Sequence, residues 1–346
     1  MTDPLLEVED LTVKYRTEGG MLTAVSDASF TIDPGEYFGL VGESGCGKST
    51  LTKSLLKGLD SNGQITSGTV RYKGEELQDL SETEINDRIR WKEISWIPQS
   101  SMNSLDPLQR VSEQALELAA VHTDLTREAA LEKFRDLFEI VGLPKERVSD
   151  YPHQFSGGMQ QRAVIALALF LDPSLIIADE PTTALDVIMQ DQVFKYLDRI
   201  KEETDTSVLL ITHDISVVFE SCDRIAIMHG GQVAETGPVT DVFDDPRHPY
   251  SILLQEAFPD VRYPDRDLGV IEGRPPESMG EVTQCTFADR CPWAVEECYE
   301  HVPPQEQVGP ADRDHTAACF RSDEVLELYR AETDHSGGAN AGTTAE

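Results

Sequence analysis

The residues GESGCGKST, at positions 42–50, constrain the fold more than any other part of this 346-residue chain. Glycines permit a tight turn that points successive backbone N–H groups at an anion, while a lysine ammonium reaches phosphate oxygens and a serine hydroxyl can ligate Mg²⁺. An apolar strand-like run precedes the loop, and a helical run LTKSLLKGL follows it, so the positive end of a helix dipole faces the anion. The pattern predicts a nucleotide site formed by Gly42, Ser44, Gly45, Cys46, Gly47, Lys48, Ser49 and Thr50.

The charge balance is strongly acidic. The chain has 63 acidic and 29 basic residues, a net charge of −34, although its charged fraction of 27% is ordinary. The imbalance therefore indicates an acidic surface over a normal interior. At molar salt, screening over about 3 Å removes the resulting self-repulsion. We expect adaptation to high salt, as in a haloarchaeal-like organism, with an acidic cytosolic protein as the simpler alternative, and no binding of nucleic acid.

The hydropathy of the chain gives no sign of a membrane segment. Its longest apolar run, at residues 163–171, has nine residues, about half of what a spanning helix needs. The amino terminus lacks the basic and apolar regions of a signal peptide. We expect a cytosolic chain that reaches a membrane only through partners.

The order of hydrophobic patterns predicts an α/β fold. Residues 103–148 have helical spacing, and a second helical segment is expected at 187–203. Buried-strand runs flank this second helix, an alternation that implies a parallel core. The strand-like runs lie at residues 5–15, 24–32, 69–74, 94–99, 174–180, 207–214 and 224–230.

A change in composition near residue 245 marks a domain boundary. Prolines multiply there, and the clustered cysteines follow. We predict a nucleotide-binding domain at 1–244 with a helical subdomain at about 100–170. A carboxyl-terminal extension follows at 245–325, then a short helix and a disordered tail at 326–346.

Motifs beyond the phosphate loop resemble those of the ATP-binding cassette (ABC) ATPases. FSGGMQQR, at 155–162, resembles the family signature, which usually has Leu in place of Phe155. LIIADE, at 175–180, resembles the Walker B strand. The resemblance covers roughly residues 5–240 and implies an ABC-type P-loop NTPase core with an antiparallel β subdomain, a helical subdomain and a small cysteine-containing extension. It also implies that Gln99 is the Q-loop residue and that Ala184-Leu185-Asp186 is the D-loop. By the same resemblance His213 is the switch histidine and Tyr15 is the A-loop aromatic.

Each motif has a physical task. Asp179 would hold Mg²⁺ with Ser49 and Gln99, and Glu180 would polarise the attacking water. By resemblance His213 would contact the γ-phosphate of ATP. Considered alone, these residues are equally typical of solvated turns and strand ends. Tyr15 would stack on adenine, although an aromatic near a strand end more often packs.

Ser156, Gly157 and Gly158 precede an apolar helix and offer a second phosphate site, or merely a helix cap. In the family this signature closes over ATP that is bound by the opposite subunit. One chain then carries two half-sites, which predicts a nucleotide-sandwich dimer.

The segment DPRHPYSILLQEAFPD, at 245–260, resembles the extension of oligopeptide/dipeptide importer ATPases, with a proline-rich connector as the alternative. The resemblance implies a second, commonly different ATPase subunit, two membrane permease subunits and an external substrate-binding protein. It places the chain at the cytoplasmic face of the membrane, where ATP hydrolysis drives uptake of peptides, or of sugars or nickel. The rival class acts on ribosomes or DNA. A single cassette, an acidic surface and the absence of a long coiled-coil insertion favour transport, and the presence of Lys48, Asp179, Glu180 and His213 argues against a catalytically silent cassette.

Six cysteines fall into two groups. Cys46 and Cys222 are typical of small packing residues. The other four are grouped near the carboxyl terminus, and because cytosolic chains seldom keep structural disulfides, they suggest a metal. Four thiolates suit a 4Fe–4S cluster, and the run CTFADRCPWA is similar to extensions of importer ATPases that carry one. Zinc and no metal are the alternatives, and zinc is weakened because the spacing is looser than in most zinc ribbons. The four residues are Cys285, Cys291, Cys298 and Cys319.

Overall fold

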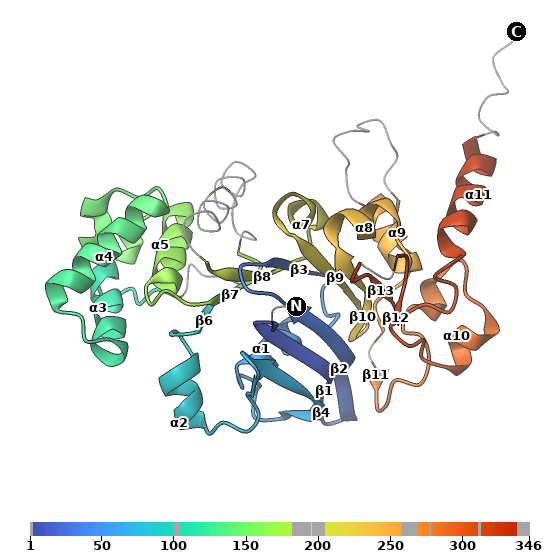
Figure 1. Cartoon of the computed structure of the whole chain (residues 1–346), viewed down its shortest axis with the longest axis horizontal. Helices are drawn as coiled ribbons and strands as arrows, with labels where there is room; N and C mark the ends of the chain where they lie inside the picture. The colour runs from blue at the N-terminus through green and yellow to red at the C-terminus, as the bar shows by residue number, and fades with distance from the viewer. Residues whose placement is uncertain are drawn as a thin grey trace, which may run out of the picture.

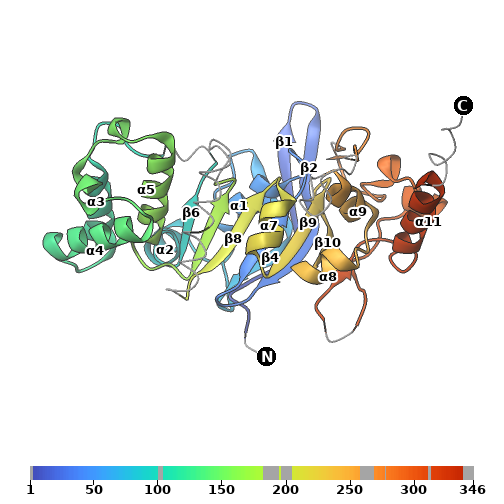
Figure 2. The ribbon, with the colours of Figure 1, turned by 90° about the horizontal axis from the view of Figure 1, so that it is seen from above.

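The computed structural model describes residues 3–99, 104–181, 195, 205–257, 269–276, 278–310 and 313–337, with no account of the side chains of 332–337. The molecule is elongated: a helical part lies at one end, two sheets lie in the middle, and the carboxyl-terminal extension lies at the other end (Figures 1 and 2).

An antiparallel sheet is formed mainly by the amino-terminal segment. Its strands have the order β11-β2-β1-β4-β5. The expected strands at 5–15 and 24–32 form the long hairpin β1–β2, and the expected strand at 69–74 is the second half of β4. The bounds are β1 Leu6–Thr17, β2 Gly20–Ile32, β4 Gly63–Tyr72, β5 Glu75–Glu76 and β11 Ser278–Met279.

The central sheet contains the parallel core that the sequence predicts. Its order is β12-β13-β10-β9-β3-β8-β7-β6. The five strands from β9 to β6 are parallel, and β10 and β13 add an antiparallel edge. The bounds are β3 Tyr37–Val41, β6 Ile94–Ile97, β7 Leu175–Asp179, β8 Ser207–Thr212, β9 Arg224–His229, β10 Gln232–Pro238, β12 Glu306–Gln307 and β13 Thr316–Ala317.

Helices surround the sheets and form the far end of the molecule. The helical part contains α3, α4 and α5, with two short 3₁₀ turns at Lys145–Ser149 and Pro152–Gln154. The helix expected at 187–203 lies outside the described residues apart from position 195. The α-helices are α1 Lys48–Leu55, α2 Glu82–Glu84, α3 Val111–His122, α4 Arg127–Ile140, α5 Gly157–Leu169, α7 Ile215–Ser221, α8 Val239–Asp244, α9 Pro249–Glu256, α10 Glu296–Glu300 and α11 Val325–Gly337.

The two faces of the central sheet face different hydrophobic cores. Successive side chains of a strand point to opposite faces, and in β7 Ile176 belongs to one core while Ile177 belongs to the other. The second core also contains Leu51 and Leu55 of α1 together with strands of the antiparallel sheet. Helix α1 therefore lies between the two sheets, which fixes the phosphate loop at its start.

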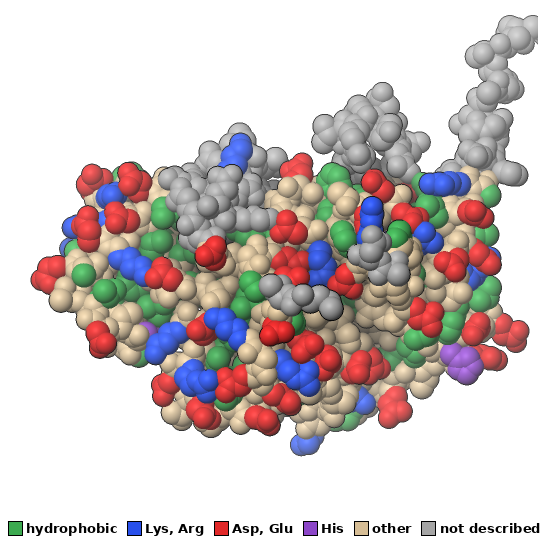
Figure 3. Space-filling view, in the orientation of Figure 1, with side chains coloured by type: hydrophobic (Ala, Val, Ile, Leu, Met, Phe, Trp, Pro, Cys, Tyr) green, Lys and Arg blue, Asp and Glu red, His purple; other side chains and the backbone are tan. Residues whose placement is uncertain are grey.

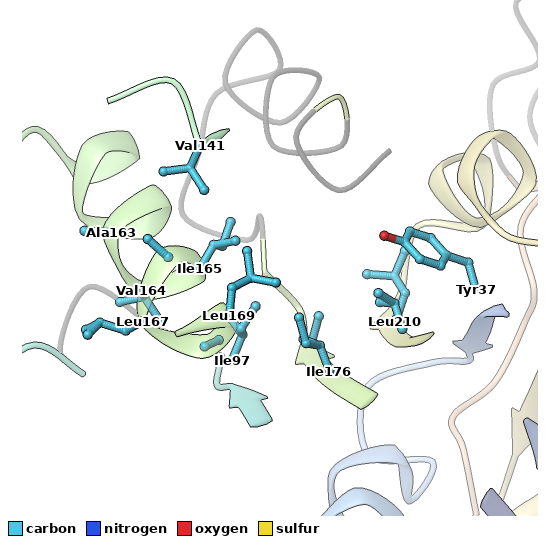
Figure 4. Close-up of a cluster of buried hydrophobic side chains, with 14 of the residues drawn as sticks. Tyr37, Ile97, Val141, Ala163, Val164, Ile165, Leu167, Leu169, Ile176 and Leu210 are labelled. Carbon is cyan, nitrogen blue, oxygen red and sulfur yellow. The ribbon is translucent and has the colours of Figure 1, made fainter. Parts of the chain in front are cut away.

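The first core continues into the helical part. Figure 4 shows side chains of α5, among them Ile165 and Leu169, beside Ile97 of β6 and Ile176 of β7. All four are buried. Burial of this apolar surface, at about 25 cal/mol per Å², stabilises the attachment of the helical part to the sheet.

The extension adds strands to both sheets. Thr316–Ala317 pairs with Glu235 and Thr236 of β10, and Ser278–Met279 pairs with β2. The expected boundary near residue 245 thus falls between segments that share a sheet. The division of the chain into domains stays a prediction.

The surface carries the acidic excess. Acidic side chains are spread over the whole visible face in Figure 3, with fewer basic ones between them. No helix in the described part of the chain is long and apolar enough to cross a membrane.

A buried histidine makes the stability of this fold depend on pH. Burial, followed by the neighbouring His229, lowers the pKa of His248 from 6.5 to about 3. Between about pH 6.5 and pH 3 the unfolded chain therefore binds one more proton here than the native chain, and stability falls on acidification. His248 accepts a hydrogen bond from the Tyr250 N–H at 3.0 Å, which His248→Asn can replace without a titrating ring. In urea titrations between pH 6.5 and 4.5 we expect the unfolding free energy of the wild type to fall more steeply than that of the variant, by about 1.4 kcal/mol per pH unit. Parallel pH profiles would contradict this assignment.

Candidate nucleotide site

The phosphate loop connects β3 to α1, and two of its glycines have no tolerance for a side chain. Gly47 has φ +109, and a Cβ there would lie 2.3 Å from the Ala24 carbonyl oxygen. A Cβ on Gly42 would lie 2.1 Å from the Met228 carbonyl oxygen. The loop is therefore pressed against the backbone of β2 and β9, which fixes its course.

Lys48 is held inside the loop. Its Nζ donates to the carbonyl oxygens of Gly42 at 2.6 Å and Glu43 at 3.0 Å, and the side chain is buried. Ser44, Gly45 and Ser49 are exposed at the surface of the loop, and Thr50 is partly buried. The exposed part of the loop thus offers backbone groups and the Ser49 hydroxyl to the solvent, and the Lys48 ammonium lies next to them inside the loop. Such a combination of groups is what an anion site requires.

Cys46 is the one predicted loop residue whose side chain has a packing role in this geometry. The side chain is 1% exposed, and burial raises the pKa of its thiol. Its backbone N–H donates to the Glu43 carbonyl oxygen at 3.2 Å. The thiol therefore lies behind the loop rather than facing a nucleotide.

Two adjacent carboxylates lie at the end of β7, near the loop. Asp179 is buried, and burial together with the charge of Glu180 raises its pKa to about 6. A neighbouring Lys48 acts in the opposite direction. Asp179 is therefore mostly ionised at neutral pH, as a Mg²⁺ ligand must be.

Glu180 connects the ends of three strands. Gln99, just after β6, donates from Nε2 to Glu180 Oε2 at 2.5 Å. His213, just after β8, has Nδ1 at 3.2 Å from Glu180 Oε1. Glu180 itself has φ +46, a left-handed conformation that costs about 1 kcal/mol or more, and its N–H bonds to the Ile211 carbonyl oxygen at 2.8 Å. The structure therefore brings together all three residues that the sequence analysis assigned to catalysis.

The remaining motif residues lie apart from this group. Tyr15 lies on β1, half-buried, with its ring over the backbone of Gly63. Ser156 is the exposed N-cap of α5, and its Oγ accepts from the Met159 N–H at 3.4 Å, so the cap role is real. Gly157 and Gly158 begin the same helix, which lies in the helical part in both views (Figures 1 and 2). The D-loop residues Ala184, Leu185 and Asp186 lie outside the described residues.

The four clustered cysteines converge on one small pocket in the extension. No disulfide joins them, and the other lining side chains include Phe287, Trp293 and Val325. Burial raises the pKa of the thiols of Cys291 and Cys319 to about 12. In the described part of the chain, however, no group of three or more His, Cys, Asp or Glu side chains is close enough to hold a metal ion. The lining residues of the pocket include Cys285, Cys291, Cys298 and Cys319.

Sequence reasoning missed the residues that join the extension to the phosphate loop. Arg290 Nη1 and Nη2 each lie 2.8 Å from a carboxylate oxygen of Glu43, and the Tyr250 hydroxyl accepts from the Glu43 N–H at 3.1 Å. In the run CTFADRCPWA the cysteines suggest a metal site, but nothing in the pattern indicates a role for Arg290. No local pattern in the sequence signals a contact across 247 positions.

A largely apolar pocket lies between the helical part and the sheet. It is lined by Trp91, which precedes β6, by Trp96 of β6, and by Val164 and Leu167 of α5. Trp91 is partly exposed there. The pocket lies along the same chain segment that leads from β6 to Gln99.

Comparison with known proteins agrees with the motifs. Residues 25–183 match the family described as ABC transporter, and residues 234–298 match the oligopeptide/dipeptide transporter C-terminal region. The oligopeptide transport ATP-binding protein OppD of Salmonella typhimurium is 42% identical over 324 residues, covering 93% of this chain and 95% of that protein. OppD of Bacillus subtilis is 41% identical, covering 88% and 86%. Among solved structures, the dimeric MJ0796, described as a bacterial ABC transporter cassette, is 28% identical with a TM-score of 0.60, covering 68% of this chain and 98% of that one. This chain belongs to the ATP-binding subunits of ABC transporters of the oligopeptide/dipeptide type.

Proposed function

We propose that the chain is the ATP-hydrolysing subunit of an importer of di- or oligopeptides. The observation that carries the proposal is the Glu180 carboxylate, which Gln99 and His213 hold at the sheet edge where the phosphate loop begins. The relatives named above as oligopeptide transport ATP-binding proteins support the substrate class.

The residues divide the work of hydrolysis among them. The loop at 42–50 and Lys48 bind the phosphates, and Ser49, Asp179 and Gln99 hold Mg²⁺, which neutralises developing charge when bound. Glu180 accepts a proton from the attacking water. The amide of Gln99 and the ring of His213 fix the orientation of the Glu180 carboxylate. Tyr15 receives the adenine ring on its face.

The signature residues Ser156, Gly157 and Gly158 support a site that is completed by a second subunit. Ser156 is exposed at the start of α5, so its hydroxyl and the free N–H groups of the helix are available to a phosphate from another chain. A solved relative is described as a dimeric cassette. We propose a sandwich with a second ATPase subunit, a heterodimer, below two permease subunits that receive peptide from an external binding protein. The chain lies at the cytoplasmic face of the membrane, and the pocket beside Trp91 receives a permease segment.

The catalytic role of Glu180 is tested in the assembled transporter. In proteoliposomes that contain the partner ATPase and the permease pair, Glu180→Gln should abolish peptide uptake and reduce ATP turnover about 100-fold or more, because the water loses its base. Binding of a fluorescent ATP analogue should persist. Stimulation of the wild type by a binding protein loaded with a sugar or nickel, and not with a peptide, would overturn the substrate class.

The same variant reports the dimer. Mixed with the partner ATPase subunit and ATP, Glu180→Gln should form a dimer of cassettes in light scattering, and adding Ser156→Arg should return the mixture to monomers, because the arginine blocks the phosphate site at the start of α5. Dimers that survive Ser156→Arg would place the signature outside the interface.

We also propose that the cysteine pocket holds a 4Fe–4S cluster. Four thiols on one apolar pocket fit the ligand set of such a cluster. A single zinc ion fits less well, because the spacing of the four cysteines along the chain is looser than in the paired cysteines of zinc ribbons. When bound, the cluster would supply one-electron redox chemistry, and it would be held by Cys298 of α10 and by cysteines of the segments before and after that helix.

Cys291→Ser tests the cluster. Purified without oxygen, the wild type should contain iron and should show the broad absorbance at roughly 400 nm that is typical of a Cys₄ iron–sulfur centre. The variant should lose most of the iron and most of this absorbance. A colourless wild type that contains one zinc per chain would overturn the cluster.

We infer that the acidic surface is an adaptation to high salt. With a net charge of −34, repulsion between surface carboxylates opposes the compact state until salt screens it. Thermal unfolding temperatures should therefore rise continuously between about 0.1 M and 3 M KCl. A rise that stops below about 0.3 M would indicate an ordinary acidic protein.

A further inference from the structure

One arginine of the extension contacts a residue of the phosphate loop. Arg290 closes the 3₁₀ turn Ala288–Arg290, which lies between Cys285 and Cys291. Its guanidinium makes two parallel hydrogen bonds of 2.8 Å to the Glu43 carboxylate. The two side chains are 6% and 24% exposed, so the pair is largely removed from solvent. Bidentate pairs of this kind are among the strongest polar contacts in proteins.

Arg290 is fixed in place by the rest of its surroundings. Its Nε donates to the Glu272 carbonyl oxygen at 2.8 Å, and the guanidinium lies over the Phe287 ring at 5.7 Å. Nη1 also lies 3.0 Å from His229 Nε2. Arginine only donates, and burial with the nearby Arg290 charge lowers the pKa of His229 to about 3, so we assign a neutral ring that accepts at Nε2. Its Nδ1–H then donates to the Thr286 hydroxyl at 3.2 Å.

Glu43 is part of the loop itself. Its carbonyl oxygen accepts from Lys48 Nζ and from the Cys46 N–H, and its own N–H bonds to the hydroxyl of Tyr250. Whatever orients Glu43 therefore orients the backbone that carries the phosphate-binding N–H groups. A carboxylate beside a triphosphate also repels it unless a cation neutralises the carboxylate.

We propose that Arg290 is a positioning residue for the phosphate loop. Arg290 favours ATP binding because it neutralises the Glu43 carboxylate and fixes the backbone of Glu43. The inference rests on the proposed assignment of residues 42–50 to ATP phosphates. It gives the cysteine-bearing extension a role at the nucleotide site, because the turn that carries Arg290 lies between two of the four clustered thiols.

The test is a double-mutant cycle on the full chain, read out by titration with a fluorescent ATP analogue. Arg290→Met should weaken ATP binding about 10-fold, since it leaves a charged Glu43 beside the phosphates; that is about 1.4 kcal/mol. In the Glu43→Gln background the same substitution should cost less than about 3-fold, because no carboxylate remains to be neutralised. In ATPase assays Arg290→Met should raise KM and leave kcat near the wild-type value.

Two further variants guard against loss of folding. Arg290→Lys keeps the charge and should recover most of the affinity. Arg313→Met is the matched control: it removes another ion pair between the extension and the cassette, to Asp241 of α8, and should leave ATP affinity unchanged. Thermal unfolding of each variant identifies any that fails to fold; if Arg290→Met does, Arg290→Gln, which also removes the charge but keeps a polar side chain, replaces it in the cycle with the same expected effect of about 10-fold.

The outcomes separate this inference from the proposed site. If Lys48→Ala binds the analogue as tightly as the wild type, the phosphate site is wrong. If Lys48→Ala weakens binding and Arg290→Met does not, the site stands and the role of Arg290 is wrong. Equal losses from Arg290→Met in both backgrounds would show that it does not act through Glu43.

Discussion

Parallel pairing of β3 with β8 and β9 is the constraint on which the rest of the structure depends. The carboxyl ends of parallel strands meet at one edge of a sheet, and this edge gathers segments that are far apart in the sequence. The phosphate loop leaves β3 there, Glu180 follows β7, and His213 follows β8. His229 ends β9 at the same edge, which is why the extension can reach the loop through it. A single topological fact thus brings Gln99, Glu180 and His213 together and also lets the extension contact the phosphate loop.

Much of this arrangement follows from local sequence. The apolar runs that became β3, β7, β8 and β9 are nearly continuous, as strands buried on both faces must be, and turn residues bound them. Because such strands pair in parallel, residues at their ends can be expected to meet. The meeting of Gln99, Glu180 and His213 was therefore predictable from the order of motifs, and the hydrogen bonds confirm that they come together.

Other features have no local signal. Strands β11 and β13 are two residues long, too short for a period-two pattern, and both form only because the extension returns to the sheets. The left-handed backbone of Glu180 is imposed by tertiary contacts, since isolated glutamate avoids it. Arg290 and Glu43 each look like an ordinary surface charge in the sequence. Their pairing depends on how the turn between two cysteines packs on His229, which no spacing rule encodes.

The site treats its carboxylates in two different ways, and the chemistry explains the difference. Three of them belong to the proposed nucleotide site: Glu43 lies in the phosphate loop, and Asp179 and Glu180 lie at the end of β7. Glu43 has no proton to take, so a guanidinium can neutralise it at no cost to catalysis. In the proposed mechanism Glu180 takes a proton from water, and the amide of Gln99 and the imidazole of His213 orient its carboxylate. The placement of arginine on one glutamate and of an amide on the other is what a site needs if it is to bind anions strongly and still keep a base.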